Sequence, residues 1–377
     1  MSFGQGMIIP TIPAIAAGFA VSPGLAVQMV TAQSLGRALF LLPAGALVDR
    51  LGGRRCMIVG ALVVALAAAT SACTSEFALL LAAQFLAGVG ATLWQLGREI
   101  TAIDLVPREQ RGRLMSGFFG LGSLGMAAGP VVGGALIEGL GFQAVFLGYM
   151  GTALLVAGLA AVMEAPDVPR SRARAPLFQI GRLSEVHPYW RATFAVVIFG
   201  SFADHLFRMT LTSLLPLYVV TQRGFSVTDV GTLFGLYGFL NLAMIVPTGF
   251  MSDKVGRKAV SVPCACLLAA SYLVFYVAGD FTLLVVATAL NGLGAGLSNG
   301  SKATYSYDVI PEEARGRLQA LRRVTIEVAG LFGPLVGGLV TDLYSPGSGF
   351  LVFAPLQVVS ALLFIFVARE SLRRQVT

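Results

Sequence analysis

Charged residues are scarce in this chain, and their scarcity decides its class. Of the 377 residues only 12% are Asp, Glu, Lys or Arg, whereas 56% are hydrophobic. Residues 1–36 carry no charge at all, and the mean hydropathy of the chain is +0.80. In soluble domains roughly a quarter of the residues are charged. The composition therefore excludes an ordinary soluble protein and indicates a membrane protein.

Other missing features narrow the chemistry. The four cysteines, Cys56, Cys73, Cys264 and Cys266, lie in or beside apolar runs without metal-type spacing, so we expect neither a disulfide framework nor a metal site. No ATP-binding P-loop is present, so any driving force would be an ion gradient. Gly-rich strings at 120–125 and 296–300 resemble enzyme motifs, but no strand precedes them. We therefore expect no cofactor and no enzymatic activity.

Long uncharged runs predict the fold class. Seven runs exceed the roughly 20 residues that cross a bilayer core, and in lipid such segments must be helical. We predict an all-α membrane protein with twelve transmembrane helices. The expected spans are 3–20, 25–47, 56–73, 77–102, 114–138, 142–163, 192–219, 227–250, 259–278, 281–306, 318–343 and 350–368.

The basic residues predict the orientation of these spans. Of 26 Lys and Arg, 21 fall in loops or the tail on one side, and only Arg223 falls in a loop on the other. By the positive-inside rule the first side is cytoplasmic, including loops 48–55 and 164–191. The formal charge of +7 therefore reflects topology and indicates no nucleic-acid partner. We expect a multi-pass protein of the inner membrane.

Three sequence segments recur at an offset of 204 residues. The hairpin 45–55 matches 249–258, and Gly129–Gly134 matches Gly333–Gly338. Residues 104–114 match 308–318 at 7 of 11 positions. Such matches indicate a duplicated unit. We predict two pseudo-symmetric six-helix halves, residues 1–163 and 192–377, joined by a Pro- and Arg-rich cytoplasmic linker at 164–191.

The first predicted span is unusually short. Gly18-Phe19 matches Gly224-Phe225 at an offset of 206, which would place the start of the first helix about fourteen residues before Met1. We expect the cytoplasmic half of the first helix to be missing from this sequence, so that this helix is truncated. The segment lacks the basic leading region of a signal peptide.

The twelve spans, the duplication and the charged hairpin resemble the major facilitator superfamily over the whole chain. The resemblance implies two halves around a central cavity that opens alternately to either side. We expect a monomer that lies in the lipid bilayer and binds a small-molecule substrate. The hairpin residues and their repeats would form a cytoplasmic conformational latch. Its members would be Gly45, Asp49, Arg50, Arg54, Asp104, Asp253, Arg257 and Asp308. Asp49 and Asp253 would accept hydrogen bonds from a neighbouring helix N-terminus and pair with Arg54 or Arg257. Simple topology determination is the alternative role.

A glycine motif in the fifth span resembles that of drug-proton antiporters. Gly125, Gly129, Pro130, Gly133 and Gly134 would let helices approach closely and would bend the span. Proton-coupled efflux of a drug-like compound is therefore our main hypothesis. Part of the motif recurs at 333–338, so packing alone explains some of it. A second motif of the family usually begins with arginine, whereas this chain has Gln84, which puts coupling at that position in doubt.

Charged residues inside spans are costly and usually functional. Arg98, Lys302 and Arg208 are candidates to line the substrate cavity. Arg98 and Lys302 are 204 residues apart, and contact of both with substrate suggests uptake of an organic anion by symport as an alternative function. A non-transporting receptor is a third possibility. Trp94 and Tyr305 could stack on a ligand or could simply pack between helices. Glu99 is a proton-coupling candidate, or it neutralises Arg98.

Asp204 is our main candidate for the proton carrier, with Glu327 as a second candidate. Burial near the bilayer midplane opposes the ionised carboxylate, whereas Arg208 lies four residues later on the same helical face and favours it. A permanent Asp204–Arg208 ion pair is the structural alternative. His205 could relay protons or could simply be hydrogen-bonded in the bundle.

Overall fold

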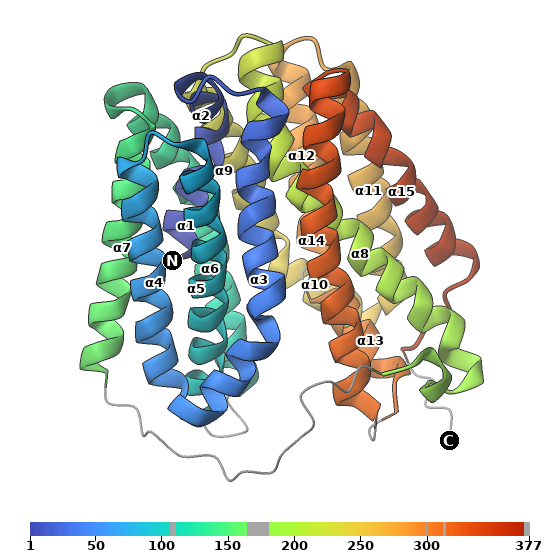
Figure 1. The fold of residues 1–377 in the computed structure, drawn as a ribbon. Helices are drawn as coiled ribbons and strands as arrows, with labels where there is room; N and C mark the ends of the chain where they lie inside the picture. The colour runs from blue at the N-terminus through green and yellow to red at the C-terminus, as the bar shows by residue number, and fades with distance from the viewer. Residues whose placement is uncertain (106–110, 164–180, 299, 312–313, 373–377) are drawn as a thin grey trace. The chain divides into compact units, whose positions relative to one another are not determined.

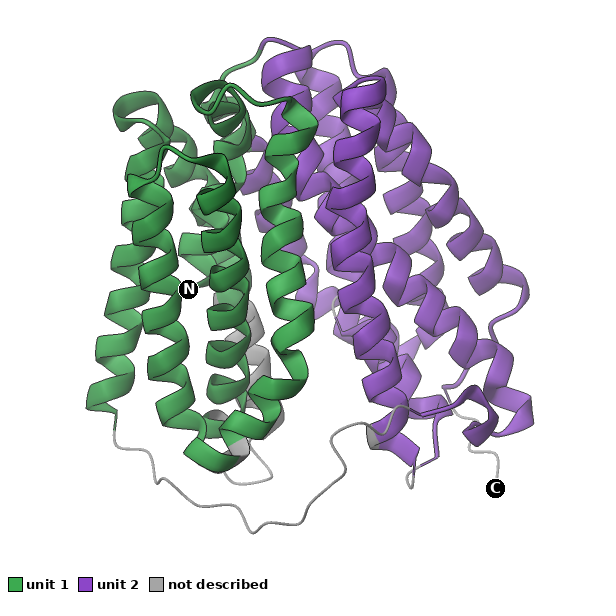
Figure 2. Ribbon diagram, in the orientation of Figure 1, with its two compact units in different colours: residues 1–177, 225–232 green, residues 178–224, 233–377 purple. Residues whose placement is uncertain are grey.

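The computed structural model describes residues 1–105, 111–163, 181–298, 300–311 and 314–372, without the side chains of 49, 102–121 and 316. Every regular element within these residues is helical, which confirms the all-α class (Figure 1). The chain forms two compact units, residues 1–177 with 225–232 and residues 178–224 with 233–377 (Figure 2). The predicted linker between two halves stays a prediction, because residues 164–180 lie outside the described residues.

Unit 1 contains five long helices after a broken first segment. Helix α3 starts at Pro23, where Ser22 Oγ accepts a hydrogen bond from the backbone N–H of Leu25, 3.2 Å away. This is a favourable N-cap, and proline fits the first helical position because it has no N–H to satisfy. The long helices are α3 (Pro23–Leu51), α4 (Gly53–Cys73), α5 (Phe77–Leu105), α6 (Arg111–Leu140) and α7 (Phe142–Val162).

The first predicted span is not one continuous helix. It consists of α1 (Ser2–Ile8), the 3-10 turn η1 (Ile9–Thr11) and α2 (Ile12–Gly18). Pro10 and Pro13 each lack a backbone donor, which weakens regular α-helical bonding between them. Thr11 Oγ1 donates to the carbonyl of Ile8 at 2.6 Å within this segment.

Unit 2 repeats the helical pattern but interrupts it more often. Its elements are η3 (Leu183–Glu185), α8 (Pro188–Leu217), η4 (Tyr218–Gln222), α9 (Val227–Ala243), α10 (Ile245–Lys254), α11 (Arg257–Val277), α12 (Phe281–Ser298), α13 (Ser301–Val309), α14 (Arg315–Leu343) and α15 (Pro346–Phe366). The first residues of α9, up to Thr232, belong to unit 1.

Two spans predicted as single helices are broken in unit 2. The span expected at 227–250 divides into α9 and α10 at Met244. The span expected at 281–306 divides into α12 and α13 beside Gly300, whose φ of 77° is left-handed. Glycine adopts this conformation without the strain that a Cβ would cause. The second break matters for the site, because Ser298 and Lys302 lie on either side of it.

Glycines in unit 1 allow helix backbones to touch. A Cβ added at Gly88 of α5 would lie 2.0 Å from the carbonyl oxygen of Gln33 in α3. One added at Gly60 of α4 would lie 2.5 Å from the backbone nitrogen of Trp94 in α5. Small residues at helix interfaces permit such approaches in membranes, where close packing replaces the hydrophobic effect as the driving force.

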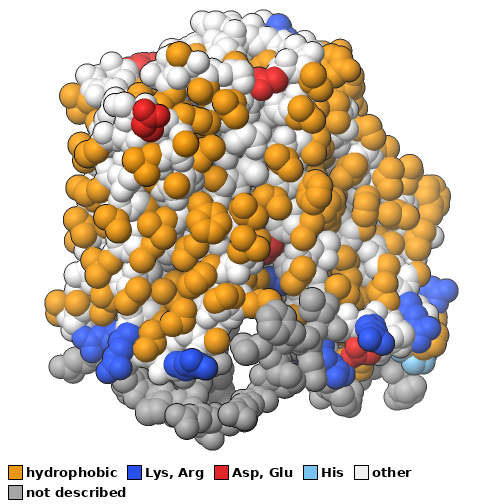
Figure 3. All heavy atoms as spheres, viewed as in Figure 1, with side chains coloured by type: hydrophobic (Ala, Val, Ile, Leu, Met, Phe, Trp, Pro, Cys, Tyr) orange, Lys and Arg blue, Asp and Glu red, His pale blue; other side chains and the backbone are white. Residues whose placement is uncertain are grey.

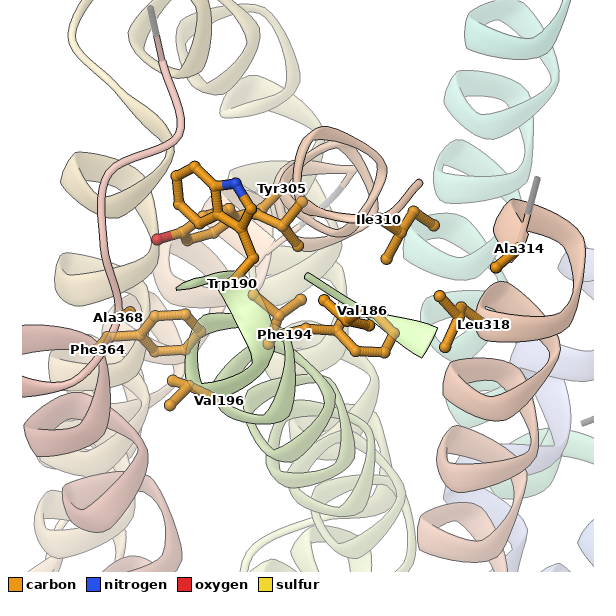
Figure 4. Packing of buried hydrophobic residues seen from close by; sticks show 12 residues of the cluster. Val186, Trp190, Phe194, Val196, Tyr305, Ile310, Ala314, Leu318, Phe364 and Ala368 are labelled. Carbon is orange, nitrogen blue, oxygen red and sulfur yellow. The ribbon is translucent and has the colours of Figure 1, made fainter. Parts of the chain in front are cut away.

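A buried apolar cluster closes one end of unit 2 (Figure 4). It joins the start of α8 to α13, α14 and α15 through Trp190, Phe194, Tyr305, Leu318 and Phe364, which are all at most 5% exposed. Large aromatic side chains contribute most of the buried apolar area here. This cluster lies next to Lys302, whose Nζ is 5.5 Å from the centre of the Phe364 ring.

Eleven helical segments of the described residues are long and apolar enough to cross a membrane. They agree with the predicted spans after the first one. On the face shown in Figure 3, hydrophobic side chains cover the flanks of the units, while Lys and Arg gather at the end predicted to be cytoplasmic. The protein is therefore a multi-pass membrane protein.

Candidate functional site

The carboxylate of Asp204 is the centre of a buried polar cluster in unit 2. It forms an ion pair with Lys302 Nζ, and its Oδ2 also accepts hydrogen bonds from Ser298 Oγ and, at 3.8 Å, from Cys264 Sγ. Its Oδ1 accepts a hydrogen bond from Gln357 Nε2 at 3.0 Å. Helices α11, α12, α13 and α15 thus each provide a donor to one residue of α8.

Lys302 is almost completely enclosed. Its side chain is 3% exposed, against 11% for Asp204. Its ammonium also donates to the carbonyl oxygen of Gly200 at 3.3 Å. A Cβ at Gly200 would lie 2.5 Å from the Phe364 ring and 3.4 Å from Cε of Lys302, so this glycine leaves the space that the lysine occupies.

Two of the donors to Asp204 flank the break between α12 and α13. Ser298 is the last residue of α12, and Lys302 is the second residue of α13. Burying two charges costs several kcal/mol for each ion, and the pair is tolerated only when further hydrogen bonds satisfy it. The donors around Asp204 meet that requirement. Interrupted helices are where membrane transporters commonly place polar sites.

The structural alternative, a permanent Asp204–Arg208 ion pair, is wrong. Arg208 Nη2 instead lies 2.8 Å from Nδ1 of His205, and the partner of Asp204 is Lys302. The sequence placed Arg208 on the same helical face four residues away, but it did not show that α13 brings a lysine to the other side of the carboxylate. His205 accepts from Arg208 through Nδ1, which requires that nitrogen to be unprotonated.

A cavity of about 160 Å³ opens beside this cluster. It is lined by residues of α8, α9, α11, α12, α13 and α14, all within unit 2. Its titratable lining residues are Asp204, His205, Arg208, Tyr237, Lys302 and Arg322. The ion pair therefore borders a cavity in which a group of a ligand can sit.

Other predicted cavity residues have separate partners. Arg98 lies over the ring of Trp94 in unit 1, with Cζ 4.7 Å from the ring centre. Glu99 Oε1 accepts from Gln95 Nε2 at 3.1 Å. Tyr305 does not line the cavity beside Asp204, and its hydroxyl donates to the carbonyl of Arg369 at 2.5 Å. Glu327 is half-buried on α14 and is also absent from the lining of that cavity.

Arg257 organises the charged cluster at the predicted cytoplasmic end of unit 2. Its Nη1 donates to Ser252 Oγ at 2.7 Å and to Asp253 Oδ1 at 2.8 Å, and its Nε donates to Asp308 Oδ2 at 2.8 Å. The expectation that Asp253 caps a neighbouring helix start is wrong. Glu370 does so, since its two carboxylate oxygens accept the backbone N–H groups of Arg257 and Lys258, each at 2.9 Å.

The latch residues of unit 1 are less completely defined. The side chains of Asp49 and Asp104 lie outside the described residues. Arg54 does not donate to a carboxylate in its described hydrogen bonds, which go to the carbonyls of Ala160 and Ala161 at 3.1 and 2.5 Å. Arg50 is exposed at the end of α3, and Gly45 has open space where a Cβ would lie. The latch role stays a prediction.

The glycine motif in α6 packs against α1. A Cβ at Gly125 would lie 2.8 Å from the backbone nitrogen of Phe3, and one at Gly129 would lie 2.4 Å from the carbonyl oxygen of Phe3. One at Gly133 would lie 2.3 Å from the carbonyl oxygen of Met7. Gly134 faces the start of α9, with Val227 O at 3.0 Å, and Pro130 lies inside the helix. These contacts explain the motif as close packing.

The sequence profile described as Major Facilitator Superfamily matches residues 1–203 and 197–377. The chain belongs to the Major Facilitator Superfamily. It is 25% identical over 328 residues to the "Multidrug resistance protein MdtH" of Salmonella arizonae, with 86% of this chain and 78% of that protein covered. It is 27% identical over 331 residues to the protein of the same name from Cronobacter sakazakii, with the same coverage. The protein is therefore a membrane transporter of this superfamily and not an enzyme.

Several residues of this superfamily member were not singled out by sequence reasoning. Ser298, Gln357 and Cys264 contact Asp204, Arg322 lines the cavity, and Glu370 caps α11. A polar residue within an apolar run was the only available signal for Gln357. Gln84, which stands where the family motif has arginine, is 2% exposed and donates to Ser71 Oγ at 3.0 Å. That contact gives it a packing role.

Proposed function

We propose that this chain is a proton-coupled efflux transporter that moves a small organic or drug-like compound across the inner membrane by alternating access. The buried Asp204–Lys302 ion pair carries the proposal, because it places a titratable carboxylate beside a cavity inside a membrane-spanning unit. Intramembrane carboxylates of this kind commonly form proton pathways in transporters. The two relatives named for multidrug resistance support a drug-like substrate.

Asp204 has the role of proton carrier in this proposal, and Lys302 sets when the proton binds. While the pair is closed, the ammonium and three further donors contact the two carboxylate oxygens. Separation of the pair would remove the ammonium from the carboxylate and leave an oxygen accessible to a proton. A conformational change that moves α13 relative to α8 would therefore couple the separation of the ion pair to proton uptake or release.

The deciding experiment uses Asp204→Asn in the full chain reconstituted into vesicles. We expect the variant to lose flux driven by a pH gradient while it keeps substrate binding and downhill exchange, because asparagine is similar in shape but cannot carry a proton. Asp204→Glu should restore part of the pH-driven flux. Glu76→Gln is the matched control, since Glu76 is an exposed acid before α5. Normal pH-driven flux in a well-folded Asp204→Asn protein would refute the assignment.

A second candidate function is proton-coupled uptake of an organic anion. The cationic residues Arg208, Lys302 and Arg322 around the cavity favour it. Flux in inside-out vesicles, with the internal pH recorded, separates the two directions: efflux predicts accumulation in the vesicles, and uptake predicts release. Binding without flux in either direction would instead indicate a receptor.

A further inference from the structure

We propose that the cavity of unit 2 binds the anionic head of the transported compound, a carboxylate or sulfonate, through Arg208 and Arg322. Both arginines line the same cavity as Asp204 and Lys302. The inference rests on the proposed transport function and assigns the chemical class of the substrate for that site. It applies to transport in either direction.

The charges around the cavity do not balance within unit 2. Among the described residues, Asp204 is the only acid that lines it, and Lys302 already neutralises that carboxylate. The hydrogen bonds described for the two arginines go to uncharged acceptors. Arg208 Nη2 contacts His205 Nδ1 at 2.8 Å, and Arg322 Nε donates to Gln319 Oε1 at 3.0 Å. Two guanidinium groups therefore remain to attract a negative charge.

The position of Arg208 in α8 indicates that its side chain does not simply extend to water at the membrane surface. Arg208 is 20 residues after Pro188, the first residue of α8, and nine before Leu217, the last. At 1.5 Å per residue these separations are about 30 and 14 Å along the helix. An arginine near a helix end can extend its head to the membrane surface, but this one is far from both ends. A cation at such a depth is costly unless it serves a ligand pathway.

The size and lining of the cavity define which part of the compound it holds. Its volume of about 160 Å³ is below the roughly 300–1,000 Å³ of pockets that enclose drug-sized ligands. It therefore suits a head group and leaves the rest of the compound outside. Ser201, Asn241 and Asn291 add polar groups, while Leu268 and Ile326 add apolar surface. Guanidinium groups bind planar oxyanions through paired hydrogen bonds, which favours a carboxylate or sulfonate over a simple halide.

The test compares three probes that differ only in the head group: 1-pyrenebutyrate, its carboxamide and the corresponding ammonium. Binding to the detergent-solubilised full chain is followed by fluorescence anisotropy. We expect the carboxylate to bind at least tenfold more tightly than the carboxamide. Arg208→Gln and Arg322→Gln should each lower the affinity for the carboxylate probe about tenfold and leave the affinity for the carboxamide probe unchanged. Arg208→Lys should keep part of the preference.

Arg323→Gln is the matched control, because Arg323 is the exposed neighbour of Arg322 and does not line the cavity. Equal affinity for the three probes, or a preference unchanged in both arginine variants, would overturn the inference. The carboxamide also reports folding, since a misfolded variant would lose both affinities. If the preference is absent while a pH gradient still drives export of a cationic dye, only this inference fails. If the arginine-dependent preference is present but no pH gradient drives any flux, only the proposed function fails.

Discussion

Arg54 and Lys258 stand 204 residues apart and each bind the end of the last long helix of their own unit. Arg54 donates to Ala160 and Ala161 at the end of α7. Lys258 Nζ donates to the carbonyls of Ile365 and Ala368 at the end of α15, at 2.5 and 3.3 Å. Positive charge at a helix C-terminus is favourable because the final carbonyls lack helical partners. Two residues that match in the sequence repeat thus make matching contacts in the two units.

Removing either cation should destabilise its unit. We expect Arg54→Gln and Lys258→Gln each to cost about 1 kcal/mol, in the usual range for a cation at a helix C-terminus. The midpoint of thermal unfolding in detergent, followed by tryptophan fluorescence, measures the effect. Arg323→Gln is the control, since Arg323 is exposed and lies far from the C-terminal end of its helix, α14. A larger loss in the control than in either variant would contradict this role.

The two acids bound by Arg257 should contribute unequally. Asp308 has a side chain 29% exposed and also accepts from Ser371 Oγ at 3.1 Å, whereas Asp253 is 74% exposed. Exposed ion pairs contribute at most about 1 kcal/mol. Loss of a partner from a more buried charge costs about 1–3 kcal/mol. Asp308→Asn should therefore lower the unfolding midpoint more than Asp253→Asn does.

The same variants test the proposed latch. If Arg257 and Asp308 hold one conformation, Asp308→Asn should change the labelling rates of single cysteines placed at the two membrane faces, while Asp253→Asn changes them less. Equal labelling in both variants and the parent protein would leave Arg257 with a purely structural role.

Alanine in the glycine motif should disrupt the contact between α1 and α6. At Gly129 and Gly133 the new Cβ would come within 2.4 Å of backbone oxygens of α1, which cannot move like a flexible side chain. We expect each variant to cost about 1–3 kcal/mol, the usual penalty for overpacking. Gly139→Ala is the control in the same helix, because no atom lies within 4 Å of its Cβ position. Unfolding midpoints that are equal for Gly129→Ala and Gly139→Ala would contradict the packing explanation.

The fold could be predicted because its signals are local or repeated. Uncharged runs gave the spans, and the basic loops gave an orientation. The 204-residue offset aligns Arg54 with Lys258, but it does not show what either residue binds. The helix breaks were harder. Gly300 is one glycine among 45, and nothing in its neighbourhood distinguishes a left-handed break from a glycine that packs.

The site was predicted only in part, because its contacts join distant residues. Asp204 was recognised from a charge within an apolar run, but its partner Lys302 is 98 positions away and Gln357 is 153 positions away. Which helices become neighbours depends on tertiary packing, and periodicity in one helix cannot supply it. The alternative of an Asp204–Arg208 ion pair failed for this reason. Glu370 was missed because nothing in the sequence shows that an acid after the end of one helix caps the start of another helix.

The neutral Asp204–Lys302 pair also has an electrical consequence. A membrane potential acts on net charge, and the closed pair has none, so its movement across the field requires no electrical work. A proton on Asp204 would leave one positive charge at Lys302, on which 100 mV exerts about 2.3 kcal/mol across the whole membrane. Under the proposed mechanism, the membrane potential would therefore act on this pair only while Asp204 carries a proton.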